Sequence, residues 1–176
     1  RIITIEDNAE LQIQGVENLV RLEAKEANLE SGTEITIRDL IRAALRMRPN
    51  RVIIGEVRGA DTFELLSALN TGHAGSLSTA HANSVKDMIS RLETMVLMGV
   101  QLPLEAIRRQ IASGIEILVH LGRGEDGSRR VEEIAEITGM EEDEIKTVSL
   151  FRREYGRGLQ KTGELVHREK LEGKTG

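Results

Sequence analysis

"RVIIGEVRG", residues 51–59, is an apolar run that ends at a glycine and then presents two charged side chains. Val52, Ile53 and Ile54 are consecutive apolar residues, a pattern typical of a strand that is covered on both faces in a mostly parallel sheet. Glu56 follows at the point where such a strand ends. The stretch therefore predicts an α/β fold with a carboxylate at the carboxyl end of one strand.

The sequence on either side alternates between strand and helix patterns. Residues 36–49 carry apolar residues at helical spacing, start with Thr36 and Asp39 as a possible capping box, and end at Pro49. The other expected elements up to residue 114 are strands at 1–7, 18–24 and 75–81, a polar loop at 26–34, and helices at 61–72, 84–99 and 103–114.

From Glu116 the pattern changes to strand-like runs separated by turn signals. Asp126 with Gly127 predicts one turn, and the region of Gly139 predicts the next. We expect an antiparallel β-meander added to the parallel sheet. After Phe151 the sequence is charged and has no clear period, which predicts a poorly ordered tail.

Composition narrows the function classes. The chain has 176 residues, which suits one compact domain, and we divide it into a domain at 1–155 and a tail at 156–176. It has no cysteine, which excludes disulfides and fits the cytosol. Its 24 basic and 29 acidic residues give a net charge of −5, and it has two Phe, one Tyr and no Trp, so direct nucleic-acid binding is not expected. No apolar stretch approaches the roughly 20 residues of a membrane span.

Because a strand pattern begins directly at Arg1, we expect a fragment of a larger protein.

Polar side chains follow three of the expected strands. Glu6 and Asp7 follow "IITI", Glu56 follows "RVIIG", and His81 follows "GSLSTA". In open α/β sheets, ligands bind at the carboxyl ends of the strands, so these side chains should converge. Carboxylates beside arginines suit Mg²⁺ and phosphate groups. For Glu56 alone, a simple solvated strand end is an equally good interpretation.

Arginines are dense around the same region. Arg38, Arg42 and Arg46 recur every four residues, and like charges at this spacing repel by about 0.2–0.5 kcal/mol per pair. An anionic partner would relieve this repulsion. The alternative is an ordinary solvated helix face, partly neutralised by Asp39 and Glu34.

Two histidines flank "AGSLSTA". His73 and His81 are eight residues apart, and either can be a hydrogen-bonded packing residue or, with carboxylates, a zinc ligand. The spacing HExxH is missing. A phosphate loop is missing too: "GKTG" at 173–176 resembles its end, but the pattern requires a glycine where the chain has Arg168.

Taken together, "ITIEDNAEL", "RDLIRAALRMRPNRVIIGEVRG", "ALNTGHAGSLSTAHANS", "SRLETMVLMG" and "LPLEAIRRQIASGIEILVHLGR" resemble the type II/type IV secretion ATPase superfamily. The nearest likeness within it is to the ATPase of tight-adherence (Flp) pilus assembly, and it runs from Arg1 to Phe151. "TIEDNAE" looks like the Asp box of the family, "VIIGE" like its Walker B motif and "GHAGSLSTAH" like its His box. The Walker A motif would lie upstream of Arg1.

The resemblance implies a RecA-like P-loop NTPase fold that uses ATP and Mg²⁺. Glu6 would polarise the attacking water, supported near the metal by Asp7 and Glu10. Glu56 would hold Mg²⁺ through water, and Asp7 is the second residue expected close to the ion.

The same resemblance implies roles between subunits. His73 and His81 would link the γ-phosphate to the subunit contact, and Arg46 and Arg58 fall where the family has conserved arginines, either of which could act across the subunit boundary. Without a Walker A motif, this chain alone is expected to bind ATP weakly and to turn it over slowly.

The function implied by the resemblance is a motor ATPase, hexameric and cytoplasmic, held at the inner membrane through platform proteins of a pilus or secretion machine. It would drive pilin extrusion or protein secretion. The alternatives are a RecA-like DNA translocase, a catalytically inactive ring-forming module, and a metal-dependent hydrolase with bound zinc.

Overall fold

The computed structural model describes residues 1–27, 34–73, 75–124 and 126–169. The chain divides into two compact units instead of the single compact domain expected from its length. One, the parallel-sheet unit, comprises Arg1–His81 and Thr94–Gln101; the other, the antiparallel-sheet unit, comprises Ala82–Glu93 and Leu102–Gly176.

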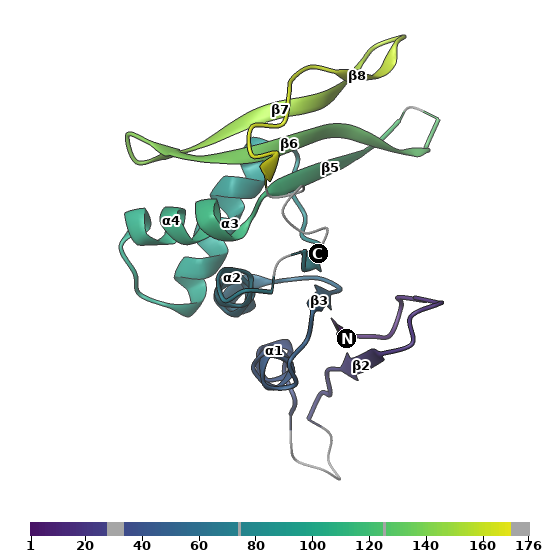
Figure 1. Ribbon diagram of the computed structural model, residues 1–176, viewed down its shortest axis with the longest axis vertical. Coiled ribbons are helices and arrows are strands. Elements are labelled where there is room, and N and C mark those ends of the chain that lie inside the picture. The colour runs from purple at the N-terminus through teal and green to yellow at the C-terminus, as the bar shows by residue number, and fades with distance from the viewer. Residues whose placement is uncertain (28–33, 74, 125, 170–176) are drawn as a thin grey trace. The chain divides into compact units, whose positions relative to one another are not determined.

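The parallel-sheet unit contains four parallel strands in the order β2-β1-β3-β4. Figure 1 labels β2 and β3 of this sheet and the helices α1 and α2. The strands are β1 (Ile2–Glu6), β2 (Leu19–Glu23), β3 (Arg51–Ile54) and β4 (Leu77–Ser78). Its helical elements are α1 (Ile37–Arg46), the short 3₁₀ helix η1 (Gly59–Asp61), α2 (Thr62–Asn70) and the second half of α3 (Val85–Gly99).

Apolar side chains of the two central strands form the core of this unit. Ile3, Ile5, Val52 and Ile54 are almost completely buried, and α1 packs onto them with apolar residues such as Ile41. The run that predicted a covered strand is therefore confirmed as β3. Each such side chain removed from water contributes about 1.5–3 kcal/mol, so this cluster holds the two central strands in place.

Helix α1 begins and ends as the sequence predicts. The Thr36 hydroxyl accepts a hydrogen bond from the Asp39 amide at 3.2 Å, and the Asp39 carboxylate accepts one from the Thr36 amide at 3.1 Å. This is the predicted capping box. The helix ends at Arg46, and Arg48 then adopts a left-handed backbone with a φ of 52° ahead of Pro49.

Two other expectations in this unit have different outcomes. The strand expected at 75–81 is only two residues long, since β4 pairs with β3 at Leu77 and Ser78 alone. Of the polar loop expected at 26–34, residues 28–33 lie outside the described residues.

The antiparallel-sheet unit is the predicted meander, with strand order β5-β6-β7-β8. Its strands are β5 (Ile117–Arg123), β6 (Arg129–Glu141), β7 (Glu144–Glu154) and β8 (Gly158–Lys161), and α4 (Leu104–Gly114) packs against β6 and β7. Ile107 and Ile111 of α4 are fully buried. In the sheet, Ala135, Ile137 and Leu150 are buried as well. The turn predicted at Asp126 and Gly127 lies between β5 and β6.

The turn predicted near Gly139 is wrong. Gly139 lies inside β6, where the pairing with β7 shifts register, and its φ is 128°. Glycine within a strand often marks such a bulge. The β6–β7 hairpin turns instead at Glu142 and Asp143, which are both left-handed with φ of 48° and 63°. Two consecutive positive φ values are what a tight two-residue hairpin requires.

The sequence after Phe151 also differs from the poorly ordered tail that was expected. Strand β7 continues to Glu154, and β8 pairs with it. Residues 162–167, which we name the C-terminal strap, then cross back over the sheet. The Thr162 amide donates to Leu150 O at 2.8 Å, and the amides of Val166 and His167 donate to the Glu136 carboxylate at 2.6 and 2.9 Å.

Candidate functional site

Glu6 and Glu56 lie at the same edge of the parallel sheet. Ile5 of β1 stands opposite Ile54 of β3, so the next residues, Glu6 and Gly55, are neighbours. A Cβ built on Gly55 would lie 3.1 Å from Cγ of Glu6. Since Glu56 follows Gly55, Glu6 and Glu56 both lie at the carboxyl edge of the sheet, the edge that their positions in the sequence predict.

Glu6 is 5% exposed, and backbone groups bind one of its oxygens. Its Oε1 accepts hydrogen bonds from the amides of Glu10 at 3.0 Å and Leu11 at 2.9 Å. These bonds hold the segment after β1 against the edge of the sheet. Glu10 therefore contributes its backbone amide to this site, while its side chain is exposed.

Glu56 is surrounded by polar partners on the turn after β3. Its Oε2 accepts a hydrogen bond from Nη2 of Arg58 at 2.7 Å, and its Oε1 lies 3.2 Å from Nε2 of His81. Thr79 fixes this turn, because its hydroxyl donates to Gly55 O at 2.5 Å and its carbonyl accepts from the Val57 amide at 3.0 Å. The segment after β4 thus both anchors Glu56 and carries His81.

Asp7 and Asp61 extend the acidic character of this edge. The hydrogen bond and the negative charge of Glu56, together with the charge of Asp7, raise the pKa of Arg58. Burial raises the pKa of the Asp61 carboxyl, with the charges of Glu64 and Asp7 acting in the same direction. Sequence reasoning missed Thr79 and Asp61, although Thr79 lies within the predicted strand at 75–81 and Asp61 begins the helix predicted at 61–72.

Two other predicted site residues lie at the opposite, amino-terminal edge of the sheet. Arg46 is in the last turn of α1, and the Arg1 guanidinium, directly before β1, donates to Met47 O at 2.6 Å. His73 follows α2 and precedes β4, with its Nδ1 3.3 Å from Ala68 O, and Ser76 of the same turn accepts from the Val52 amide at the start of β3. The structure therefore gathers Glu6, Asp7, Glu56, Arg58 and His81 but places Arg46 and His73 away from them.

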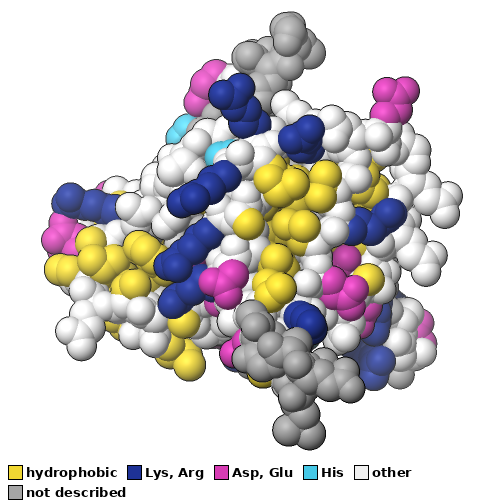
Figure 2. All heavy atoms as spheres, turned by 90° about the horizontal axis from the view of Figure 1, so that it is seen from below, with side chains coloured by type: hydrophobic (Ala, Val, Ile, Leu, Met, Phe, Trp, Pro, Cys, Tyr) yellow, Lys and Arg dark blue, Asp and Glu magenta, His cyan; other side chains and the backbone are white. Residues whose placement is uncertain are grey.

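The arginine ladder on α1 has an internal partner. Glu64 of α2 pairs with Arg38 at 3.2 Å and with Arg42 at 2.8 Å. Glu64 is 8% exposed, so two arginines neutralise a buried carboxylate. This accounts for two of the three repeating arginines without an external anion. The charge of Asp39, one of the neutralising residues that the sequence indicated, also interacts with Arg38 and Arg42. Figure 2 shows basic side chains lying in a row beside apolar ones on one face of the molecule.

The donor set at the carboxyl edge fits Mg²⁺ held indirectly. Across the described ranges, no group of three or more His, Cys, Asp or Glu side chains is arranged to hold a metal ion. Mg²⁺ keeps several waters and is bound through one or two carboxylates plus substrate phosphates. Glu56 and Asp7 can supply such carboxylates, whereas a zinc site built from protein side chains has no cluster to support it in this part of the chain.

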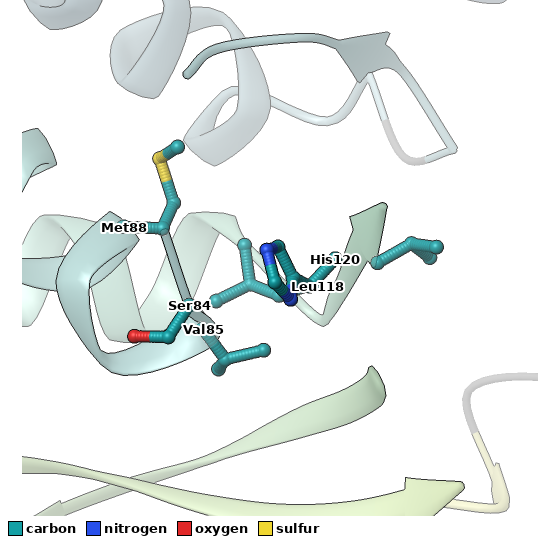
Figure 3. Close-up of a pocket in the computed structure, with 6 residues that line it drawn as sticks. Ser84, Val85, Met88, Leu118 and His120 are labelled. Atoms are coloured by element: carbon teal, nitrogen blue, oxygen red, sulfur yellow. The ribbon is translucent and has the colours of Figure 1, made fainter. Parts of the chain in front are cut away.

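A small hollow lies in the antiparallel-sheet unit (Figure 3). Ser84 and Met88 at the start of α3 line it together with Leu118 and His120 of β5. The Ser84 hydroxyl accepts from the Asp87 amide at 3.0 Å and so caps the helix as predicted. None of the predicted site residues lines this hollow.

The described helices include none with the length and hydropathy that a membrane span needs.

The model of the type II/IV secretion system protein family matches residues 1–153. The chain belongs to this family. A putative conjugal transfer protein of Mycobacterium tuberculosis is 41% identical over 89% of the chain and 44% of its own length. The type IV secretion system protein VirB11 of Brucella abortus is 38% identical over 74% of the chain and 37% of its own length.

The fold of this family member is likewise similar to a solved secretion ATPase. The crystal structure of the VirB11 ATPase from the Brucella suis type IV secretion system, in complex with sulphate, superposes with a TM-score of 0.66 at 35% identity, over 76% of this chain and 39% of that one. The predicted fold class, a RecA-like, mostly parallel sheet with flanking helices and an antiparallel meander, is confirmed. The chain spans less than half the length of these relatives. The finer likeness to the Flp pilus ATPase stays a prediction.

Proposed function

We propose that this type II/IV secretion family chain is the C-terminal part of the ATPase domain of a secretion or pilus-assembly motor. The observation that carries the proposal is that Glu6 and Glu56 lie at the carboxyl ends of adjacent parallel strands, with Arg58 and His81 bound to Glu56. Phosphoryl transfer depends mainly on positioning and on neutralising negative charge by metal ions and arginine. Acidic and basic groups at one strand edge suit both tasks.

Each residue at this edge has a role in the proposal. Glu6 orients the attacking water, and Glu56 and Asp7 hold the hydrated Mg²⁺ of the nucleotide. Arg58 neutralises charge on the phosphates, and His81 contacts the terminal phosphate. The phosphate loop that would cradle the β- and γ-phosphates is supplied by sequence upstream of residue 1.

Arg46 and His73 have a separate proposed role. Because they lie at the amino-terminal edge, they support catalysis only by reaching the site of a neighbouring subunit. The proposal therefore includes a ring, most simply a hexamer, in the cytoplasm, docked on inner-membrane platform proteins. The relatives that are named as secretion-system proteins support this setting.

The experiment uses the complete protein, including the upstream phosphate loop, and two single substitutions, Glu6→Gln and Glu56→Gln. Both should reduce ATP hydrolysis by about 100-fold or more, because the charge that positions water or metal is lost. Nucleotide binding should stay measurable by isothermal titration calorimetry. Glutamine at position 6 keeps a carbonyl oxygen for the amides of Glu10 and Leu11, so the local fold is preserved.

Two further measurements complete this test. Glu141→Gln is the matched control, since Glu141 is an exposed carboxylate at the end of β6, and it should hydrolyse ATP at the parent rate. If either site variant turned over ATP like the parent protein, the assignment of that carboxylate would be wrong. The inactive-module alternative predicts that the complete parent protein itself shows no hydrolysis.

A further inference from the structure

Glu56 makes contacts that compete with the role proposed for it. Arg58 occupies Oε2 at 2.7 Å and His81 lies 3.2 Å from Oε1. A carboxylate that holds hydrated Mg²⁺ must direct at least one oxygen to the metal's water shell. A guanidinium at 2.7 Å also repels a divalent cation brought to the same group.

We infer that Arg58 and His81 form a gate on Glu56: they compete with the divalent cation for its carboxylate and must release it for the cation to bind. This inference rests on the proposed function and adds a control step to it. The two side chains are thus positioning residues for Glu56 before they act on any phosphate.

Exposure indicates which groups move when the gate opens. The side chains of Arg58 and His81 are 71% and 82% exposed, whereas that of Glu56 is 21% exposed. Thr79 also ties the turn that carries Glu56, through Gly55 O and the Val57 amide. The Glu56 carboxylate therefore stays in place when the gate opens, and the side chains of Arg58 and His81 rotate into solvent.

Arg58 has a second acidic group within reach of its charge. Asp7, at the end of β1, interacts electrostatically with the guanidinium. His81 has a different setting, because it is the last residue before the chain passes into the antiparallel-sheet unit.

The test measures Mn²⁺ binding to the complete protein saturated with ADP, by the electron paramagnetic resonance signal of free Mn²⁺. Arg58→Gln and His81→Gln should each lower the Mn²⁺ dissociation constant by roughly two- to five-fold, the range expected for losing an exposed ion pair. Arg58→Lys keeps the charge and should stay close to the parent value. Arg48→Gln is the matched control, an exposed arginine at the opposite edge that should change nothing.

A double substitution separates the gate from a general change in charge. In a Glu56→Gln background, Arg58→Gln should bring no gain in Mn²⁺ affinity, because the contact it would release is already lost. An equal gain in both backgrounds would overturn the gate. So would an unchanged or weaker Mn²⁺ affinity of Arg58→Gln and His81→Gln in a protein that binds ADP normally.

A measurement on the unsubstituted protein covers the case of a variant that does not fold. Mg²⁺ added to the ADP complex should shift the Arg58 Nε–H and His81 ring resonances in nuclear magnetic resonance spectra, as the contacts to Glu56 break. Unshifted resonances at saturating Mg²⁺ would contradict the gate. A parent protein that binds neither ADP nor Mn²⁺ would instead contradict the proposed function.

Discussion

At the scale of single residues, the close approach of Gly55 to Glu6 sets how the ends of β1 and β3 pack at the carboxyl edge of the sheet. A Cβ at position 55 would approach Cγ of Glu6 to 3.1 Å and its Cβ to 3.6 Å. Glu6 is buried and tied to the amides of Glu10 and Leu11, so it has little room to move. The close approach of Glu6 therefore favours glycine at position 55, since any larger residue would force the Glu6 side chain to shift by a few tenths of an ångström.

We expect Gly55→Ala to destabilise the protein by about 1–2 kcal/mol, since overpacking a filled site forces side chains off their preferred positions. It should also reduce ATP hydrolysis by the complete protein, because displacing Glu6 moves the group that we propose orients the attacking water. Urea denaturation and a steady-state ATPase assay measure the two effects. In a Glu6→Ala background the same substitution should cost less stability. An alanine variant as stable and active as the parent would contradict this interpretation of the contact.

The sequence predicted part of this site for a simple reason. Glu6, Glu56 and His81 each follow a strand, and parallel strands end at one edge, so order along the chain implied proximity. Arg46 and His73 were grouped with them by resemblance, but a helix that returns antiparallel to the strands carries its last turn to the other edge. Thr79 could not be predicted, because its role depends on a hydrogen bond to a backbone carbonyl 24 residues away.

At the scale of secondary-structure elements, the C-terminal strap depends on a buried carboxylate. Glu136 is 2% exposed and accepts from the amides of Val166 and His167 and from His167 Nδ1 at 2.9 Å. Burial alone raises the pKa of Glu136, but these hydrogen bonds outweigh it and hold the pKa below its usual value. The strap is ordered, in contrast to the tail that was expected, because its amides and the His167 ring form hydrogen bonds with a carboxylate that the sheet buries.

The depressed pKa gives the strap a pH dependence with a definite sign. Its contribution to stability is present above the ordinary glutamate pKa and is lost as the pH falls through the lower folded value. Glu136→Gln should reduce the free energy of unfolding at pH 7 by about 1–3 kcal/mol, the range for a hydrogen-bonded charged group. Between pH 7 and acidic pH, this variant should lose less stability than the parent protein.

Urea denaturation across this pH range checks the strap, with Glu141→Gln as the control because Glu141 is exposed. Parallel pH profiles for parent and Glu136→Gln would show that the strap does not depend on the Glu136 charge.

The elements themselves were largely predictable. Caps at Thr36 and Ser84 and the continuous apolar run of β3 are local signals, and all three were confirmed. The turn predicted near Gly139 was wrong because glycine occurs both in turns and in β-bulges. Only the pairing of β6 with β7 distinguishes the two.

At the scale of the whole molecule, the chain forms two units that share α3. The sequence showed no break there, since α3, which begins at Val85, continues into the other unit without a linker. The family assignment covers residues 1–153, while the relatives are more than twice as long as the matched segments. Weak ATP binding by this chain alone therefore stays a prediction that follows from the position of the phosphate loop.

The central claim is that Glu6 and Glu56 lie beside the same divalent ion and the terminal phosphate of a nucleotide, with Glu56 holding the ion through water and Glu6 orienting the attacking water. The most direct test is the anomalous scattering of Mn²⁺ in crystals of the complete protein with bound nucleotide. We predict a peak at the carboxyl edge of β1 and β3, one water molecule away from the Glu56 carboxylate. A peak beside Arg46 and His73 at the opposite edge, or nucleotide bound with its metal remote from both carboxylates, would contradict the account.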